Sequence, residues 1–214
     1  MTLMLKEQAY RLFKKRLFAG DLKPGQFVSQ RELCKIIGLP IGPVRDALKK
    51  LQAESLVRVI PQRGIHIADV NVKLVRDAFG MRSLIEAYAV RRFAAAGDVA
   101  RLVAMEPQMR AVLTRAAKNF DEDLAREFIR IDFKLHDALI STLDNEIISE
   151  VYRINADRIL LIRLTNRVSR ERVITATKEH LKIIDALKRH DADAAAAAME
   201  QHLASSLQGM LGVA

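Results

Sequence analysis

The sequence predicts a mainly α-helical chain, with an N-terminal winged helix-turn-helix in residues 1–70 and an all-helical bundle of about six helices in residues 71–214. Three observations support this prediction. Hydrophobic residues recur at helical spacing along most of the chain, and their period changes to two only between residues 56 and 69. Positive charge is concentrated at the start, because residues 1–70 hold 13 Lys and Arg against 6 Asp and Glu, whereas residues 71–214 hold 22 against 20. With 214 residues, half of them hydrophobic and 29% charged, the chain is long enough for two packed domains.

The first two helices are bounded by clear start and stop signals. Hydrophobic residues at three-and-four spacing in residues 5–17 predict a helix that ends near residue 18, because "AGDLKPG" then supplies glycine and proline. Ser29 can cap a second helix, with Glu32 three residues later to complete a capping box. This helix is expected to stop at Gly38.

A third helix follows after a turn of only a few residues. Its first turn holds Pro43, where the missing N–H costs nothing. Its buried face is expected to consist of Val44, Leu48 and Leu51. Arg45 and Lys49 lie on another face, one helical turn apart. This basic face is free to contact a partner.

Residues 56–69 predict a small β-hairpin, because valine and isoleucine alternate with polar residues on both sides of "PQRG". Three helices followed by such a hairpin make a winged helix-turn-helix. In this fold Arg45 and Lys49 would face a DNA major groove, while Arg63 at the hairpin tip would reach the backbone or the minor groove. The alternative is a solvated helix face beside a basic turn.

After residue 70 the pattern is helical to the end, and Pro107 is the only proline. The alanine run 194–198 is also expected to be helical, with Asp191 or Asp193 as its cap. The expected helices cover about 72–95, 98–117, 121–142, 145–168, 171–189 and 192–211. Helices of this length pack as a bundle.

Three histidines and one aspartate of this bundle form a candidate metal site. Asp132 and His136 are one helical turn apart, so one helix can present both side chains to one ion. His180 and His202 each lie among hydrophobic residues at helical spacing that turn the histidine inward. A lone inward histidine is more often a hydrogen-bonded core residue, and the Asp132–His136 pair could equally face solvent. Three histidines with an aspartate in one bundle favour a shared divalent metal.

The remaining sequence features concern location. Cys34 is the only cysteine and lies among hydrophobic residues, so an intramolecular disulfide is impossible and a small buried residue is expected there. No hydrophobic stretch approaches the roughly 18 residues that a membrane span requires. We therefore expect a cytoplasmic protein with no membrane partner.

The chain resembles a GntR-family transcriptional regulator of the FadR subfamily with an FCD ligand-binding domain, and its short second domain is similar to the VanR branch. The N-terminal resemblance is carried by "GDLKPGQFVSQRELCKIIGLPIGPVRDALKKLQAESLVRVIPQRGIHI". It follows the family spacing of Gly-x-Leu-x-Pro-Gly, Glu-Leu, Pro-Val-Arg-x-Ala-Leu and Arg-Gly. The C-terminal resemblance is carried by Arg82 and Glu86 in "MRSLIE", Asp132, His136, Asn145, His180 and His202.

The resemblance implies roles for particular residues. It implies that zinc or nickel is held by Asp132, His136, His180 and His202. It also implies that Arg31, Arg45, Arg63 and Gly64 contact DNA. The helix pattern adds Lys49 to this expected DNA-binding set. The chain departs from the family where relatives carry Ser-Arg-x-Pro-Val-Arg, because Ile41 stands in place of the arginine.

These features together predict a metabolite-responsive regulator that binds a palindromic double-stranded DNA operator as a homodimer. A small organic acid is expected to bind at the metal, with open coordination positions and nearby arginines to hold its carboxylate. The expected effector-binding residues are Arg82, Glu86, Arg163 and Asn166. Two alternatives remain at this point: a metal-dependent hydrolase with Glu86 as a conceivable base, and a regulator whose metal only stabilises the bundle.

Overall fold

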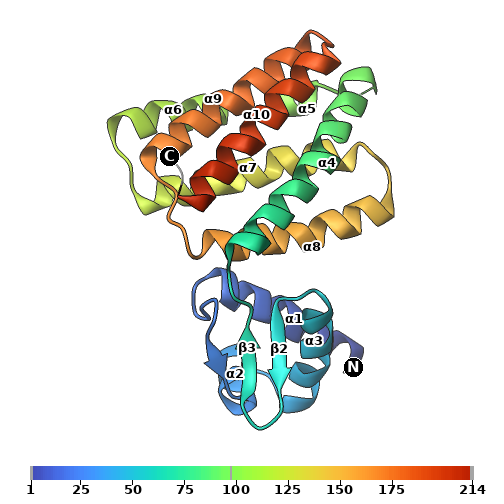
Figure 1. The fold of residues 1–214 in the computed structure, drawn as a ribbon, viewed down its shortest axis with the longest axis vertical. Coiled ribbons are helices and arrows are strands. Elements are labelled where there is room, and N and C mark those ends of the chain that lie inside the picture. Colours follow the sequence, from blue (N-terminus) through green and yellow to red (C-terminus); the bar gives the residue numbers. More distant parts are fainter. Residues whose placement is uncertain (1, 97, 213–214) are drawn as a thin grey trace. The chain divides into compact units, whose positions relative to one another are not determined.

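The computed structural model describes residues 2–96 and 98–212, which form two compact units. The first unit comprises residues 1–74 together with residues 156–166, and the second comprises residues 75–155 and 167–214. As predicted, helices dominate both (Figure 1). The predicted domains 1–70 and 71–214 remain a prediction. In the described part of the chain, no helix has the length and hydrophobicity needed to cross a membrane.

The first unit contains three helices and a small sheet. The helices are α1 (Thr2–Phe18), α2 (Gln30–Ile37) and α3 (Ile41–Ala53). The Ser29 side chain accepts a hydrogen bond from the backbone N–H of Glu32 at 3.1 Å, so the predicted cap of α2 is confirmed. Gly38 ends this helix in the left-handed conformation, at φ 75°. The resulting short turn fixes α3 directly after α2.

The sheet of this unit has three strands in the order β1-β3-β2, all antiparallel to their neighbours. They are β1 (Phe27–Val28), β2 (Val57–Ile60) and β3 (Gly64–Ile67). The predicted hairpin is confirmed as β2–β3, and in the structure Val57 pairs with Ile67. The two-residue β1 was not predicted, because its pairing with β3 joins residues far apart in the sequence.

The core of the first unit consists of side chains from all these elements. Phe13 and Leu17 of α1, Leu51 of α3 and Ile65 of β3 are fully buried in it. Leu161, near the end of α8 (Glu146–Arg163), belongs to the same core. The hydrophobic stripe of each helix therefore packs the three helices and the sheet of this unit around one core.

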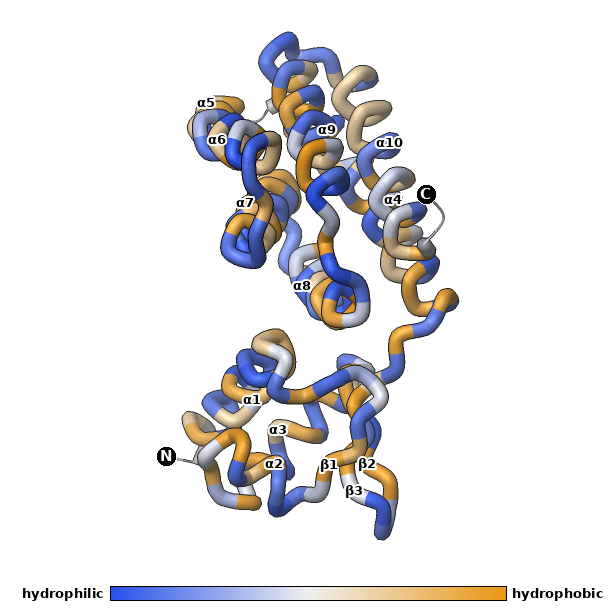
Figure 2. Tube along the Cα trace, turned by 90° about the vertical axis from the view of Figure 1, so that its left-hand side faces the viewer, coloured by the Kyte–Doolittle hydropathy of each residue, from blue (hydrophilic) through white to orange (hydrophobic). Residues whose placement is uncertain are grey.

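The second unit is a helical bundle. Besides the first part of α8 it contains α4 (Val72–Ala96), which starts at its border with the first unit, α5 (Ala100–Val103), α6 (Glu106–Lys118), α7 (Glu122–Ser141), α9 (Arg170–Lys188) and α10 (Ala192–Leu211). Hydrophobic and hydrophilic residues alternate along these helices in Figure 2, as expected for helices that bury one side. The core between them is made of leucine and alanine with isoleucine, valine, methionine and phenylalanine.

One expected helix of this unit is divided in the structure. The sequence predicts a single helix over 98–117, whereas α5 ends at Val103 and α6 starts at Glu106. Pro107 lies in the first turn of α6 and has no N–H to donate to the carbonyl of Val103. The chain therefore turns at Ala104 and Met105, where the N–H of Met105 bonds to Leu102 at 2.9 Å.

Candidate metal centre and nucleic-acid interface

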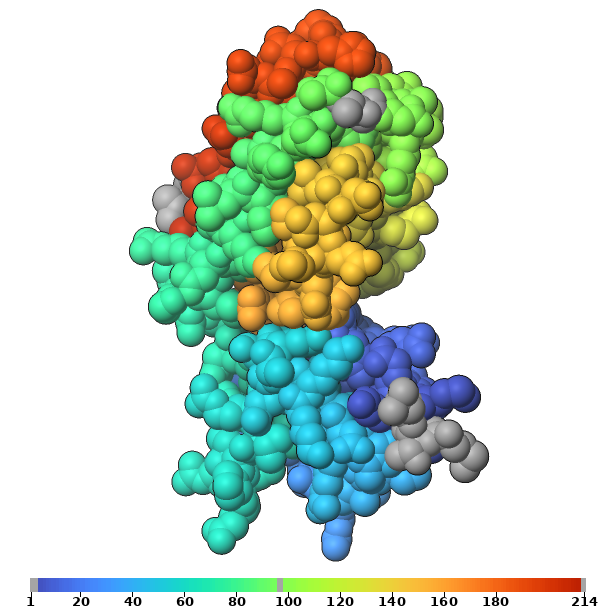
Figure 3. Space-filling view, turned by 90° about the vertical axis from the view of Figure 1, so that its right-hand side faces the viewer, coloured from blue at the N-terminus to red at the C-terminus, as the bar shows by residue number. Residues whose placement is uncertain are grey.

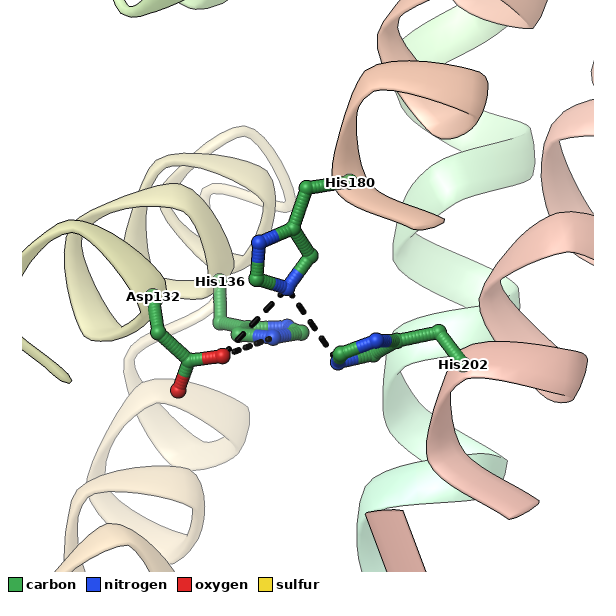
Figure 4. Close-up of side chains that lie close together, drawn as sticks. All are labelled: Asp132, His136, His180 and His202. Atoms are coloured by element: carbon green, nitrogen blue, oxygen red, sulfur yellow. Dashed lines mark hydrogen bonds and ion pairs between the residues drawn. The ribbon is translucent and has the colours of Figure 1, made fainter. Parts of the chain in front are cut away.

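The four predicted metal ligands lie together inside the second unit (Figure 4). Asp132 and His136 come from successive turns of α7, His180 comes from α9 and His202 from α10. Each offers one ligand atom, and these atoms all lie within 4.8 Å of one another. All four residues are buried, with exposed fractions of 1 to 3%. Their convergence depends on the packing of three helices.

The ligand atoms of this cluster face one another at short range. Oδ1 of Asp132 lies 3.3 Å from Nε2 of His180 and 3.7 Å from Nε2 of His136. Nε2 of His180 also lies 3.3 Å from Nε2 of His202. Three imidazole nitrogens and a carboxylate oxygen thus surround one point. These contacts cannot all be hydrogen bonds, because an imidazole nitrogen with a lone pair accepts a hydrogen bond but cannot donate one.

Behind His136, a buried carboxylate contacts the outer nitrogen of the ring. Oε2 of Glu86 on α4 lies 2.6 Å from Nδ1 of His136, a charge contact that is not aligned as a hydrogen bond. Glu86 is fully buried and accepts hydrogen bonds from Nε of Arg82 at 2.6 Å and from the Tyr152 hydroxyl at 2.8 Å. Because Glu86 lies at Nδ1 of the ring, Nε2 of His136 points toward the centre of the cluster.

His202 has a similar support on its outer side. Its Nδ1 lies 2.9 Å from Oε2 of Glu179. Because an ionised carboxylate only accepts hydrogen bonds, Nδ1 carries the proton and the lone pair of Nε2 faces the cluster. Arg172 fixes Glu179 through Nη2 at 3.0 Å and donates to the hydroxyls of Ser205 and Ser206 at 2.8 and 2.7 Å.

The sequence named Arg82 and Glu86 as effector contacts and not as supporting residues, and it assigned no supporting role to Tyr152, Arg172 or Glu179. Arg172 and Glu179 are seven residues apart on α9 and therefore share a helix face, which is the one available signal. Their partners His202, Ser205 and Ser206 lie on α10, so only the packed structure brings the two sides together. The same holds for Tyr152 of α8 and Glu86 of α4.

Burial and charge set the protonation of this cluster. Burial lowers the pKa of His180, and burial together with the neighbouring imidazoles lowers the pKa of His202 well below its usual value. Burial also opposes protonation of His136, but the Glu86 carboxylate outweighs it and raises the pKa of His136. Burial alone would raise the pKa of Glu86, yet the charges of Arg82 and His136 lower it. Glu86 is therefore ionised, and His180 and His202 are neutral near pH 7.

This donor set fits a divalent transition metal. Neutral imidazole nitrogens and a carboxylate oxygen are ligands that zinc and nickel accept, and carboxylates behind metal-bound histidines are a usual second layer. A hydrogen-bonded core would explain one or two of the histidines. It does not explain why Nε2 of His180 and of His202 both point at the same place, together with Asp132.

The predicted effector-binding residues fall into two groups. Arg82 and Glu86 are buried in the second unit and paired with each other, and Glu86 contacts His136. Arg163 and Asn166 are partly buried residues of the first unit, each engaged in interactions there or elsewhere in the chain. Their role in effector binding stays a prediction.

The predicted DNA-contacting residues of the helices are exposed in the first unit. Arg45 and Lys49 lie on the exposed face of α3, and Arg31 is exposed on α2. Nε of Arg45 donates to Oε1 of Gln30 at 3.1 Å, and Nζ of Lys49 lies 3.0 Å from Oδ1 of Asp46. The opposite face of α3 is buried in the core through Val44, Leu48 and Leu51. A helix held in this way can present its basic side chains to a large polyanion.

The hairpin tip carries the other two predicted residues. Arg63 is exposed in the turn, and the tip is hydrophilic in Figure 2. Gly64 has a packing role that the sequence did not predict. Its φ is 101°, and a Cβ atom on it would lie 2.8 Å from the carbonyl oxygen of Val28, so any other residue would displace β1. Whether Gly64 also contacts DNA stays a prediction.

Comparisons with known proteins match both parts of the chain. Residues 77–205 match the FCD domain family, and residues 5–67 match the family of bacterial regulatory proteins named gntR. The uncharacterized HTH-type transcriptional regulator YdhC of Bacillus subtilis (strain 168) is 28% identical over 88% of this chain and 83% of its own length. The HTH-type transcriptional repressor RspR of Escherichia coli (strain K12) is 26% identical over 94% of this chain and 87% of its own.

Solved structures show the same fold. The E. coli protein McbR/YncC has a TM-score of 0.79 at 18% identity and covers 97% of each chain. The metal-free FCD domain of the regulator TM0439 has a TM-score of 0.56 at 21% identity and covers 68% of this chain and 97% of its own. The matching families and relatives are transcriptional regulators and not enzymes, so the hydrolase alternative is set aside.

Proposed function

Because the chain belongs to the GntR-family transcriptional regulators that carry an FCD domain, we propose that it is a cytoplasmic, metabolite-responsive regulator whose effector binds at a divalent metal. In this proposal residues 1–70 bind the DNA operator and residues 71–214 bind metal and effector. The observation that carries the proposal is the buried convergence of Asp132 with three histidines, whose ligand atoms lie within 4.8 Å of one another.

The metal site would be formed by Asp132, His136, His180 and His202. Zinc or nickel bound there would offer open coordination positions to a small carboxylate. Glu86 and Glu179 would orient His136 and His202 so that Nε2 of each ring faces the ion. Arg82, the buried partner of Glu86, would supply a guanidinium for the carboxylate of the effector. Arg163 and Asn166 are further proposed effector contacts.

The operator would be contacted by the exposed basic side chains of the first unit. Arg45 and Lys49 of α3 would enter the major groove, Arg31 would contact the DNA, and Arg63 would reach the backbone or the minor groove. Nε of Arg45 donates to Gln30, and this hydrogen bond would leave the rest of the guanidinium to contact a guanine edge. The positive charge of residues 1–70 would supply the affinity that does not depend on sequence.

A homodimer would place two such helices on a palindrome, with the half-sites about 34 Å apart. Exposed hydrophobic side chains on α4 and on the first part of α8 support a contact between copies. Leu84 is 79% and Ile147 77% exposed, with Tyr88 and Val151 one turn further along each helix. The two helices lie side by side on one face of the second unit (Figure 3).

This face can be tested directly. Replacing both Leu84 and Ile147 by glutamate should convert a dimer to a monomer, because charged residues at the centre of a two-fold contact are repelled by their own copies. Light scattering after gel filtration measures the mass. An unchanged dimer of the double variant would place the contact elsewhere.

The proposed sensing role requires that effector and metal act together. The effector must bind more tightly to one arrangement of the DNA-binding units than to another, since an effector with equal affinity for both does not change their populations. We would screen mono-, di- and tricarboxylic acids by thermal shift on zinc-loaded and chelator-treated protein. A sensor should be stabilised by a carboxylate only when loaded with zinc.

The competing function of the metal, a purely structural role, gives a different result in the same screen. Zinc alone would raise the melting temperature, and none of the carboxylates would raise it further. A carboxylate that stabilises the chelator-treated protein equally well would contradict binding at the metal.

A further inference from the structure

The recognition face of α3 starts with a hydrophobic residue. Ile41 is the first residue of α3 and is 44% exposed. It lies one and two helical turns before Arg45 and Lys49, so the three side chains form one exposed stripe. A single exposed isoleucine is ordinary on a protein surface. Its position on this stripe is what makes it informative.

The start of a recognition helix is the part that contacts base edges in the major groove. Next to Ile41 the helix carries Gly42, and a Cβ atom added there would meet nothing within 4 Å. The first turn therefore presents the Ile41 side chain beside bare backbone, and this backbone can approach the bases closely. The Pro40 side chain makes no capping hydrogen bond across this surface.

The chemistry of the groove then limits what Ile41 can contact. Donors and acceptors of adenine, guanine and cytosine gain nothing from an isoleucine and lose water beside it. The 5-methyl group of thymine is the hydrophobic feature that a base pair displays in the major groove. Isoleucine cannot donate a hydrogen bond, so it distinguishes bases through this methyl group.

Resting on the proposed DNA-binding function, we propose that Ile41 is a specificity-determining residue that packs on the 5-methyl group of a thymine in each operator half-site. Four residues along a helix correspond to about 6 Å, and stacked bases are about 3.4 Å apart. The thymine is therefore expected within about two base pairs of the base contacted by Arg45.

The test uses the full-length protein and DNA that it selects itself. High-affinity duplexes are selected from a randomised pool, and each thymine of the selected half-site is then replaced by deoxyuridine, which lacks only the methyl group. Loss of one buried methyl contact should weaken binding about fourfold per half-site. Fluorescence anisotropy measures the dissociation constants.

The inference predicts a coupling between one methyl group and one side chain. Deoxyuridine at one thymine per half-site should weaken binding by the wild type and leave binding by the Ile41→Ala variant unchanged. Met4→Ala, which removes another exposed hydrophobic side chain from α1, should keep the wild-type response. Ile41→Ala should keep its melting temperature, since an exposed alanine suits a helix.

Two failures are distinguishable. In the first, duplexes are selected, but deoxyuridine at every thymine leaves wild-type binding unchanged, or the Ile41→Ala variant loses as much affinity with deoxyuridine as the wild type does. Either result overturns the role of Ile41, while DNA binding stands. If the pool yields no preferred duplex at all, the proposed sequence-specific DNA binding fails, and the role of Ile41 fails with it.

Discussion

The Asp/His cluster of the second unit and the exposed face of α3 each include two polar side chains one helical turn apart, Asp132 and His136 in the first and Arg45 and Lys49 in the second, but they differ in their surroundings. The cluster is at most 3% exposed, and its ligand atoms face one another. Arg45 and Lys49 are exposed, and each contacts one polar side chain nearby, Gln30 and Asp46.

This difference shows what each site can bind. Burial removes the converging lone pairs from bulk water, and a small cation would satisfy them at once. On α3 the charges are already hydrated, and they gain most from a partner that offers many phosphates and releases its counterions. Substitutions in the cluster should therefore change metal binding and stability, and substitutions on α3 should change DNA binding alone.

The largest expected effect concerns two of the ligands. A His180→Ala, His202→Ala variant keeps Asp132 and His136 but loses half of the donor set. At a zinc concentration about a hundredfold above the dissociation constant, the free energy of unfolding of the wild type should rise by about 2.7 kcal/mol. This corresponds to a rise of about 5–10 °C in melting temperature. The variant should show no zinc-dependent shift, as measured by thermal denaturation with and without chelator.

Circular dichroism provides the control for this variant, because a helical spectrum shows that the bundle has folded. A zinc-dependent shift of the same size in the folded variant would break the comparison, since the buried cluster would then not be where zinc binds.

The second effect concerns the carboxylates behind the histidines. Glu179→Gln removes the charge that fixes Nδ1 of His202, and Glu86→Gln does the same at His136. Each should lower zinc affinity by about 10- to 100-fold, as supporting residues of metal sites do. Competition with a chromophoric chelator measures the affinity. Glu171→Gln, an exposed position on the same helix as Glu179, is the matched control. Equal affinities in all three variants would show that the carboxylates do not support the ligands.

The third effect belongs to the exposed face. Arg45→Ala should weaken binding to a selected duplex by about 1–3 kcal/mol if Arg45 contacts a base edge. Zinc affinity and melting temperature should stay at the wild-type values, because the side chain is exposed and its main polar neighbour is Gln30. Arg126→Ala, which removes an exposed arginine of α7, should leave DNA binding unchanged. An unaltered binding isotherm for Arg45→Ala would contradict the base contact.

The smallest effect distinguishes phosphate contacts from base contacts. Lys49→Ala should weaken binding to all duplexes alike and reduce the slope of log affinity against log salt by about one. Anisotropy titrations at several salt concentrations give the slope. A loss confined to one duplex sequence would assign Lys49 to a base instead.

The same contrast explains how much the sequence could predict. The Ser29 cap, the hairpin and the Asp132–His136 spacing depend on residues close in sequence, and local patterns predicted them. The assignment of His180 and His202 needed the resemblance to a family as well as the hydrophobic pattern.

The features that were missed depend on contacts between distant segments. Strand β1 exists through its pairing with β3, and Gly64 is required because the backbone of Val28 passes close to it. Arg172 and Glu179 acquire their role only where α9 meets α10. Pro107 was noted in the sequence, but a single helix over 98–117 was predicted across it, and this prediction was wrong.

Metal content tests the central claim most directly. Purified wild-type protein, loaded with zinc or nickel and dialysed, should retain about one equivalent per chain by elemental analysis, and a folded Asp132→Ala, His136→Ala variant should retain far less. Retention of the same amount by the variant, or of none by the wild type, would contradict a metal centre in the bundle.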